Sequence, residues 1–204
     1  RDAEGLFALV QMGGLEVHTW GSRASSVERP DQLVFDLDPD VSLPWGRVVE
    51  AAGLVREQLA ERGFTGFVKT TGGKGLHVVV PIEPRAEWDE VKAFCKAFVE
   101  ELVRAEPEKY LAVMSKNKRT NKIYLDYLRN GRGATAVCAF STRARPGAPV
   151  SMPISWDELQ RSGMSSARFD VKNVPARLES LAEDPWAGFD DARAPLPKAR
   201  ARRA

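Results

Sequence analysis

Hydrophobic residues recur with two different periods along this chain, and these periods predict both helices and strands. A spacing of three or four residues marks 44–62 and 88–104 as helices, which Gly63 and Pro107 would end. Shorter apolar runs are typical of strands, and they cover residues 33–38, 64–70, 76–82, 110–114, 123–127 and 134–140. Short elements are also expected at 6–10, 15–18, 155–158 and 173–183. We therefore expect a domain over residues 1–190, followed by a basic linker or tail at 191–204.

Two aspartates interrupt one of these apolar strands. Asp36 and Asp38 stand two positions apart, so both carboxylates leave one face of the strand, while Phe35 and Leu37 point into a core. Pro39 is expected to end the strand. Adjacent like charges cost free energy unless a cation lies between them, and carboxylate oxygens suit magnesium or manganese. Two solvated acids at a strand end are the alternative.

A glycine-rich loop follows the strand expected at 64–70. Residues 70–75 read Thr-Thr-Gly-Gly-Lys-Gly, in which small residues let backbone N–H groups approach an anion and Lys74 adds a positive charge. The spacing differs from that of a Walker A loop, which opens a helix. A tight hairpin turn with an incidental lysine remains the alternative.

A third aspartate, Asp126, lies within the apolar run at 123–127, where a carboxylate is expensive unless it is paired. We expect it to join the two acids of the earlier strand. Lysine and arginine far outnumber acids between residues 109 and 132, which predicts a positive patch usable for phosphates. A solvated charged loop is the alternative.

The chain contains two histidines, His18 and His77. His18 would share one strand face with Glu16 and Trp20, where a lone histidine is more often a filler than a ligand. His77 lies just inside the strand after the glycine-rich loop and could point toward whatever that loop holds.

The composition is 43% hydrophobic and 28% charged over 204 residues, which is typical of a globular protein. No stretch is long and apolar enough to cross a bilayer, and the first residues do not resemble a signal peptide, so no membrane partner is expected. Cys95 and Cys138 fall in apolar patterns and are expected to be buried free thiols in a reducing compartment.

Four motifs, in this order, resemble one known family. They are Glu-Val-His-Thr-Trp-Gly-Ser around His18, Phe-Asp-Leu-Asp-Pro at 35–39, Thr-Gly-Gly-Lys-Gly-Leu-His at 71–77 and Tyr-Leu-Asp-Tyr-Leu-Arg-Asn-Gly-Arg-Gly at 124–133. The chain resembles the primase-like polymerase domain of the bacterial ATP-dependent DNA ligase D, of the archaeo-eukaryotic primase superfamily. The resemblance implies an α+β primase-polymerase fold, in which an RRM-like antiparallel or mixed sheet carries the acids and packs with a second α/β layer.

The resemblance also implies an activity, namely metal-dependent nucleotidyl transfer that extends a DNA primer with a preference for ribonucleotides during non-homologous end joining. The implied partners are primer–template or broken DNA ends, nucleoside triphosphates and the Ku end-binding protein, in the bacterial cytoplasm. Asp36, Asp38 and Asp126 would hold two Mn²⁺ or Mg²⁺ ions, with His18 nearby as a further catalytic residue. The implied nucleotide-binding residues are Thr71, Gly72, Lys74, His77 and Arg143. The implied nucleic-acid contacts are Lys116, Lys118, Arg119, Lys122 and Arg129.

Two departures from the family pattern and two other interpretations remain. The N-terminal portion that holds a 5′-phosphate in relatives is expected to be absent, and Thr71 stands where relatives often have serine. A catalytically inert primase-like module could bind DNA ends without chemistry. The Phe-Asp-Leu-Asp sequence also opens haloacid-dehalogenase phosphatases, although Gly-Thr typically follows there, whereas Pro39-Asp40 follows here.

Overall fold

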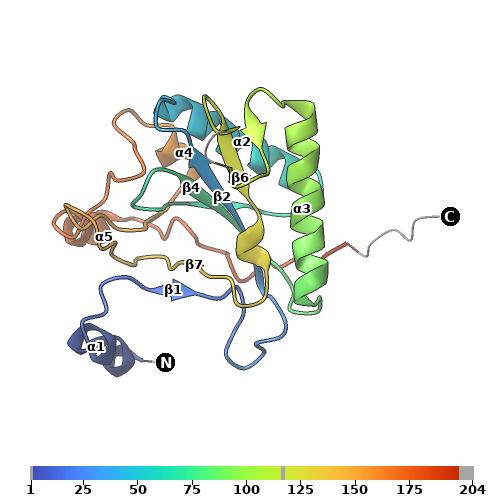
Figure 1. Cartoon of the computed structure of the whole chain (residues 1–204). Coiled ribbons are helices and arrows are strands. Elements are labelled where there is room, and N and C mark those ends of the chain that lie inside the picture. The colour runs from blue at the N-terminus through green and yellow to red at the C-terminus, as the bar shows by residue number, and fades with distance from the viewer. Residues whose placement is uncertain (1, 116–117, 198–204) are drawn as a thin grey trace.

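The computed structural model describes residues 2–115 and 118–197, which form the helices and strands labelled in Figure 1. The helices are α1 (Ala3–Gln11), α2 (Trp45–Ala60), α3 (Trp88–Ala105), α4 (Trp156–Leu159) and α5 (Val174–Ser180), with a 3₁₀ turn η2 (Leu128–Asn130). The strands are β1 (His18–Thr19), β2 (Gln32–Pro39), β3 (Phe67–Thr70), β4 (Leu76–Pro81), β5 (Tyr110–Leu111), β6 (Ile123–Asp126), β7 (Ala136–Val137) and β8 (Pro153–Ile154). No helix in these described ranges is long and apolar enough to span a membrane.

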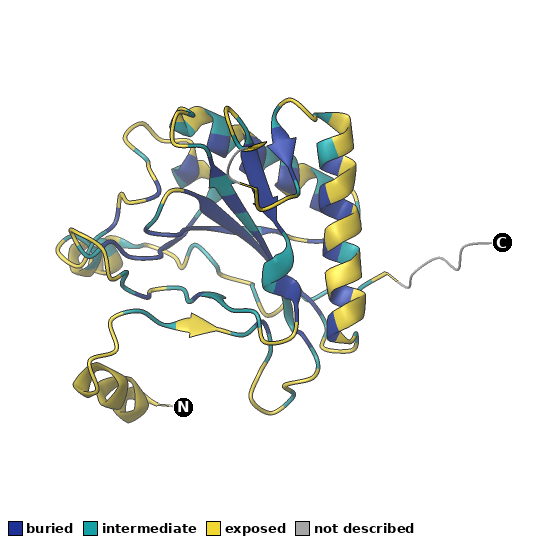
Figure 2. Ribbon diagram, viewed as in Figure 1, coloured by how far each residue is buried: buried dark blue, intermediate teal, exposed yellow. Residues whose placement is uncertain are grey.

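Six strands form one sheet in the order β5-β6-β2-β4-β3-β8. Neighbouring strands are antiparallel except for the parallel pair β5 and β6. Helices α2 and α3 lie on one face of this sheet, and buried residues concentrate between helices and sheet (Figure 2). This arrangement confirms the predicted α+β class.

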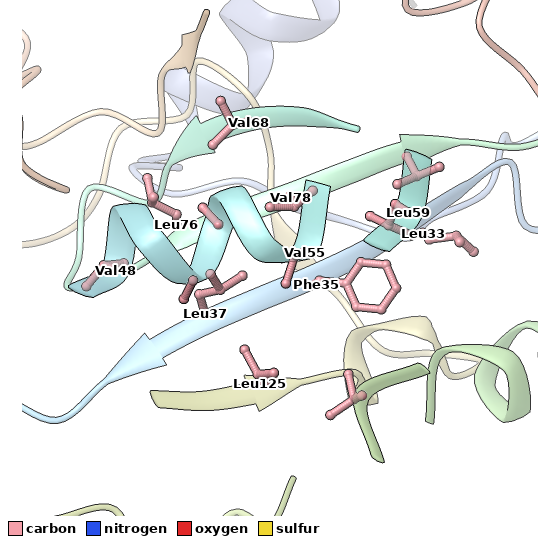
Figure 3. Close-up of a cluster of buried hydrophobic side chains, with 14 of the residues drawn as sticks. Leu33, Phe35, Leu37, Val48, Val55, Leu59, Val68, Leu76, Val78 and Leu125 are labelled. Atoms are coloured by element: carbon pink, nitrogen blue, oxygen red, sulfur yellow. The ribbon is translucent and has the colours of Figure 1, made fainter. Parts of the chain in front are cut away.

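The core forms because the apolar stripe of α2 matches the apolar face of the central strands. Val48, Val55 and Leu59 follow the helical spacing and are at most 1% exposed. Figure 3 shows this stripe against side chains of β2 and β4, among them Phe35 and Val78. Pro44 is the extended residue just before the helix rather than part of its first turn, where the sequence pattern places it, and Gly63 follows the helix with φ 81°.

Two strands, β1 and β7, form a separate antiparallel ribbon. His18 pairs with Val137, and Thr19 pairs with Ala136. The apolar run at 134–140 predicts one buried strand, and this prediction is wrong in length and burial, because only Ala136 and Val137 pair. Phe140 has φ 63° and is 51% exposed, so the segment turns away from the ladder after the ribbon.

Other predicted strands are shorter than their apolar runs. The run at 110–114 contributes only Tyr110 and Leu111, because Val113 and Met114 are exposed. The run at 64–70 begins its ladder at Phe67, after the turn that ends α2. The apolar runs therefore predict where these strands lie, but they overestimate the number of residues that pair in the sheet.

The segment after Pro185 packs against the sheet although its sequence shows no period. The Trp186 indole N–H donates to the carbonyl of Val68 at 2.9 Å, and the Trp186 ring stacks on Phe189 with centroids 5.0 Å apart. Ala194 forms a β-bridge with Ile82. The division between domain and basic tail at residue 190 stays a prediction, and residues 198–204 lie outside the described ranges.

Both cysteines carry free thiols, as the sequence predicts. Cys95 lies on the buried face of α3, and burial raises the pKa of its thiol. Cys138 is only half-buried, because it follows the ribbon rather than entering the core.

Candidate active site

Three aspartates gather on the sheet face that α2 and α3 leave uncovered. The register of β2 places Asp36 opposite Asp126 of β6 on one side and opposite His77 of β4 on the other. Directly paired residues of antiparallel strands point to the same face, so the side chains of Asp126, Asp36 and His77 form a row across the sheet. We call this row, together with Asp38, the aspartate row. Asp38 leaves the same face two residues further along, as the alternation predicts.

One arginine bridges two of these carboxylates. The Arg129 Nη2 atom lies 3.3 Å from an oxygen of Asp36, and its Nε atom lies 3.2 Å from an oxygen of Asp126. The Asp126 carboxylate also accepts hydrogen bonds from the Tyr124 hydroxyl at 3.2 Å and from the Leu128 N–H at 2.8 Å. Its orientation is therefore fixed by groups on its own strand and the following turn.

A second arginine pairs with the remaining aspartate. The Arg119 guanidinium forms an ion pair with Asp38 and stacks over the Tyr124 ring, 4.6 Å from its centroid. The family resemblance suggests a DNA contact for Arg119, and that role stays a prediction. In the structure this side chain belongs to the carboxylate cluster.

The ionisation of the row follows from burial and nearby charge. Burial raises the pKa of Asp36, but the contacts with His77 and Arg129 lower it by more, so the net pKa lies below its ordinary value. Burial holds the pKa of Asp126 above its ordinary range. Burial, assisted by the charge of Lys69, lowers the pKa of His77 to about 4, so this imidazole is neutral at pH 7.

The glycine-rich loop is the hairpin loop between β3 and β4, and two of its glycines are required by close approach. A Cβ on Gly75 would lie 1.8 Å from the carbonyl oxygen of Leu37, so glycine alone lets the loop pack against the acid-bearing strand. Gly72 has φ 63°, and a Cβ there would lie 2.8 Å from Arg143. The Thr71 hydroxyl donates to the Gly75 carbonyl at 3.0 Å, which braces the loop from within.

A glutamate that sequence reasoning does not single out as functional connects the ribbon to this loop. One oxygen of Glu16 lies 2.6 Å from Nε2 of His18 and 2.9 Å from Nε of Arg143. These contacts, the one with His18 above all, lower the pKa of Glu16 to about 2. Arg143 in turn donates to the carbonyl of Thr71. The spacing of Glu16 two residues before His18 is the signal that could have found it.

These elements enclose a cavity of about 580 Å³. The predicted site residues that line it are His18, Asp36, Asp38, Thr71, Lys74, His77, Arg119, Arg129 and Arg143. Arg145 and Asp40 line it as well, although neither is a predicted site residue. Arg143 and Arg145 lie at a bend, where the Arg145 N–H donates to the Arg143 carbonyl at 2.8 Å, and the pair of arginines two positions apart is the available signal for Arg145.

Several predicted residues lie outside the cavity wall. Asp126 is buried behind Arg129, and Gly72 is buried within its loop. Lys118 is exposed, and the Lys122 ammonium donates to the Pro107 carbonyl at 2.8 Å. Lys116 lies outside the described residues. The basic loop therefore borders the cavity through Arg119.

Carboxylates on one face are suitable ligands for a divalent ion, but guanidinium groups hold them in this structure. Within residues 2–115 and 118–197, no three His, Cys, Asp or Glu side chains are arranged to hold a metal ion. Arg129 lies between Asp36 and Asp126 and contacts both carboxylates, which are the groups that would hold a divalent cation. The oxygen donors fit Mg²⁺ or Mn²⁺ in chemistry, provided that these arginines move.

Comparisons with known proteins place the sequence and the fold in one family. The family model described as "LigD, primase-polymerase domain" matches residues 1–186. The chain is 47% identical over 194 residues to the multifunctional non-homologous end joining protein LigD of Pseudomonas aeruginosa, covering 95% of this chain and 23% of that protein. It is 31% identical over 179 residues to the bifunctional LigD of Bacillus subtilis, covering 87% of this chain and 29% of that one.

A solved structure shows the same fold. The polymerase domain of Mycobacterium tuberculosis ligase D, in complex with DNA, superposes with a TM-score of 0.84 at 28% identity, over 94% of this chain and 69% of that one. The chain spans about a quarter of the length of the curated relatives above. The family match replaces the phosphatase interpretation of the Phe-Asp-Leu-Asp sequence. The chain belongs to the LigD primase-polymerase domain family.

Proposed function

We propose that this domain transfers nucleotides to the 3′ end of a DNA primer, with a preference for ribonucleotides, in double-strand break repair by non-homologous end joining. The observation that carries the proposal is the pairing of Asp36 with Asp126 on adjacent strands, with Asp38 on the same face, beside a cavity walled by cations and a glycine-rich loop. The names of the matched relatives support the repair context.

Asp36, Asp38 and Asp126 would hold two Mn²⁺ or Mg²⁺ ions. Bound ions would lower the pKa of the primer hydroxyl and stabilise the charge of the transferring phosphoryl group. Tyr124 and Leu128 already fix the orientation of Asp126, so this carboxylate needs little reorganisation. Arg119 and Arg129 would turn from the carboxylates toward phosphate oxygens, which guanidinium groups bind well.

The triphosphate would bind between the glycine-rich loop and the ribbon. Lys74 is exposed on the cavity wall, and Arg143 reaches the same space from the other side. His77 is neutral at pH 7, so its imidazole can donate one hydrogen bond to a phosphate oxygen without carrying a charge. Thr71 and Gly72 would shape the loop around the phosphates, because their own N–H groups already donate to the carbonyls of Gly75 and Ser166. His18 would contact the nucleotide from the ribbon.

DNA would approach over the basic loop beside the cavity. Lys118 is exposed there, next to Arg119, and cations at such a position attract DNA phosphates. The solved relative in complex with DNA supports a primer–template or a broken DNA end as the partner. Interaction with Ku rests on the family resemblance, and a bacterial cytoplasmic location is proposed on the same ground.

Primer extension tests the proposal directly. Wild type should extend a labelled primer with Mn²⁺ or Mg²⁺, and a ribonucleotide should compete favourably with the matching deoxynucleotide. Asp36→Ala and Asp38→Ala should each lower the extension rate by about a hundredfold or more, about 2.7 kcal/mol of activation free energy, while DNA binding persists. Asp157→Ala, an exposed acid in the first turn of α4, is the matched control and should leave extension unchanged. DNA binding by a wild type that extends no primer would support the inert end-binding module instead.

A further inference from the structure

A buried lysine lies under the cavity and touches none of its carboxylates. Lys69 is 3% exposed and forms no ion pair with a described residue. It is the strand partner of His77, so its side chain leaves the sheet on the same face as the aspartate row. Burying an ammonium without a carboxylate is costly, and burial lowers the pKa of Lys69 to about 7. Because burying this ammonium costs free energy, its presence here needs a structural or functional explanation.

The hydrogen bonds of this ammonium connect the two sheets of the molecule. Nζ of Lys69 donates to the carbonyl of Val137 at 2.9 Å and to the Ser151 hydroxyl at 2.8 Å. Val137 belongs to β7 and is the direct strand partner of His18. The Ser151 hydroxyl in turn donates to the carbonyl of Thr70 at 3.0 Å, so Ser151 is itself bonded to β3, the strand that carries Lys69.

Just after β7, the Phe140 N–H donates to the Ser151 carbonyl at 2.7 Å, and the Ser151 N–H donates to the Ser141 carbonyl at 2.9 Å, so Lys69 holds β7 itself within a wider contact. The ribbon is weak on its own. Its two strands pair over only two residues each, and both residues of β1 are exposed. Two residues a strand are too few for independent stability. Arg129 donates to the Thr135 carbonyl at 3.3 Å just before β7, but the same side chain also contacts both Asp36 and Asp126. Among the described residues, Lys69 forms no ion pair with a carboxylate of the cavity, and its ammonium donates to Val137 and Ser151.

We propose that Lys69 is a positioning residue: its buried ammonium ties the β1–β7 ribbon to the main sheet, and so sets how far His18 stands from the aspartate row. The functional part rests on the proposed nucleotidyl transfer, because His18 faces a cavity that would hold the nucleotide. Lys69 itself does not line that cavity, so any effect it has on nucleotide binding must pass through the ribbon.

Amide hydrogen exchange tests the tether without any assay of activity. In Lys69→Met, exchange in peptides 15–20 and 134–140 should accelerate about tenfold, because the Cys138 N–H bond to the Val17 carbonyl loses its support. Exchange in the β2–β4 ladder should stay at the wild-type rate. Lys96→Met is the matched control, since it removes an exposed ammonium of α3, and it should change neither region. If Lys69→Met does not fold, Ser151→Ala, which removes one of the two acceptors of the ammonium, replaces it and should accelerate exchange in the same peptides.

Two exchange results would overturn the tether. Unchanged ribbon exchange in the folded variant would mean that Lys69 does not hold the ribbon. Equal acceleration in the ribbon and the β2–β4 ladder would mean that Lys69 is a general core residue.

Nucleotide affinity, measured without DNA, tests the positioning. Titration with a fluorescent ribonucleoside triphosphate and Mn²⁺ should give a dissociation constant about threefold to tenfold higher for Lys69→Met than for wild type or Lys96→Met. A loosened ribbon with unchanged affinity would contradict the positioning role. If wild type binds no nucleotide, the proposed function fails, and the exchange measurement alone decides whether Lys69 positions the ribbon.

Discussion

The two faces of β2 are built from alternating residues and carry opposite properties. Leu33, Phe35 and Leu37 are at most 1% exposed and pack under α2 and α3. Asp36 and Asp38, which alternate with them, face a polar cavity and are held by arginines. The same strand therefore packs into the core on one face and carries the candidate catalytic aspartates on the other. The backbone of these aspartates is held in place because the strand is part of the packed sheet.

Because side chains alternate between the two faces of a strand, the residues of β2 that stabilise the core are different from those that face the candidate site. Substitutions on the helix face should act on the free energy of unfolding. Substitutions of Asp36 and Asp38, on the cavity face of β2, should act on binding and rate. The predictions below test this separation, from the largest expected effect to the smallest.

The largest effect on stability is expected for Phe35→Ala. Phe35 packs against Phe98 with ring centroids 4.9 Å apart, and removing a buried phenyl ring costs about 3–5 kcal/mol through lost burial and a cavity. Asp38→Ala, three positions away and 39% exposed in its side chain, should change stability by no more than about 1 kcal/mol. Urea unfolding of both variants measures this difference, and similar losses would contradict the separation of the two faces.

Lys69 should make stability depend on pH. Its pKa is about 7 in the folded protein and 10.5 ordinarily, so the unfolded state binds more protons between these values. Stability should therefore rise with pH across that window, by up to about 1.4 kcal/mol per pH unit. Urea unfolding of wild type and Lys69→Met at several pH values isolates this contribution. The slope should be smaller in the variant, and parallel curves would show that Lys69 titrates normally.

The core and the aspartate row can be predicted from the sequence because both follow local periods. The helical stripe of Val48, Val55 and Leu59 identifies α2, and strand alternation alone places Asp36 and Asp38 on one face. The pairing of Asp126 with Asp36 depends on sheet register, which is a long-range property. Sequence reasoning reaches it only through the cost of an aspartate within an apolar run.

The ribbon side of the cavity cannot be predicted in the same way. Its position depends on single contacts between residues far apart in the chain, such as Lys69 with Val137 and Glu16 with Arg143. Residues 134–140 are apolar enough for a buried strand, yet Phe140 is exposed. Such tertiary contacts leave no periodic pattern in the sequence. The sequence therefore overestimates the length of β7 and does not predict that Glu16 and Arg145 belong to the site.

Lys74→Ala should weaken nucleotide binding by about tenfold, about 1.4 kcal/mol, because it removes an exposed cation from the glycine-rich loop. Steady-state extension should show this as a higher KM for the nucleotide with kcat little changed. Lys96→Ala on α3 controls for the loss of a surface charge. A variant that lost DNA affinity and kept its nucleotide KM would assign the loop to the primer.

The smallest effect is expected at the basic loop. Lys118→Ala should flatten the plot of log DNA affinity against log salt concentration by about 0.9, the value for one lost contact with a duplex phosphate. Nucleotide binding without DNA should be unchanged, because Lys118 does not line the cavity. Titrations of a primer–template at several salt concentrations decide the matter, and identical slopes would leave Lys118 without a DNA contact.

The most direct test of the central claim is a double-mutant cycle on the paired carboxylates. Primer extension rates are compared for wild type, Asp36→Ala, Asp126→Ala and the double variant, with DNA binding measured in parallel. If the two residues act as one site, each single variant should lose about a hundredfold or more in rate, and the double variant should be little worse than either. Extension by Asp126→Ala at near wild-type rate would contradict the account, because the register of β2 and β6 makes this residue the partner of Asp36.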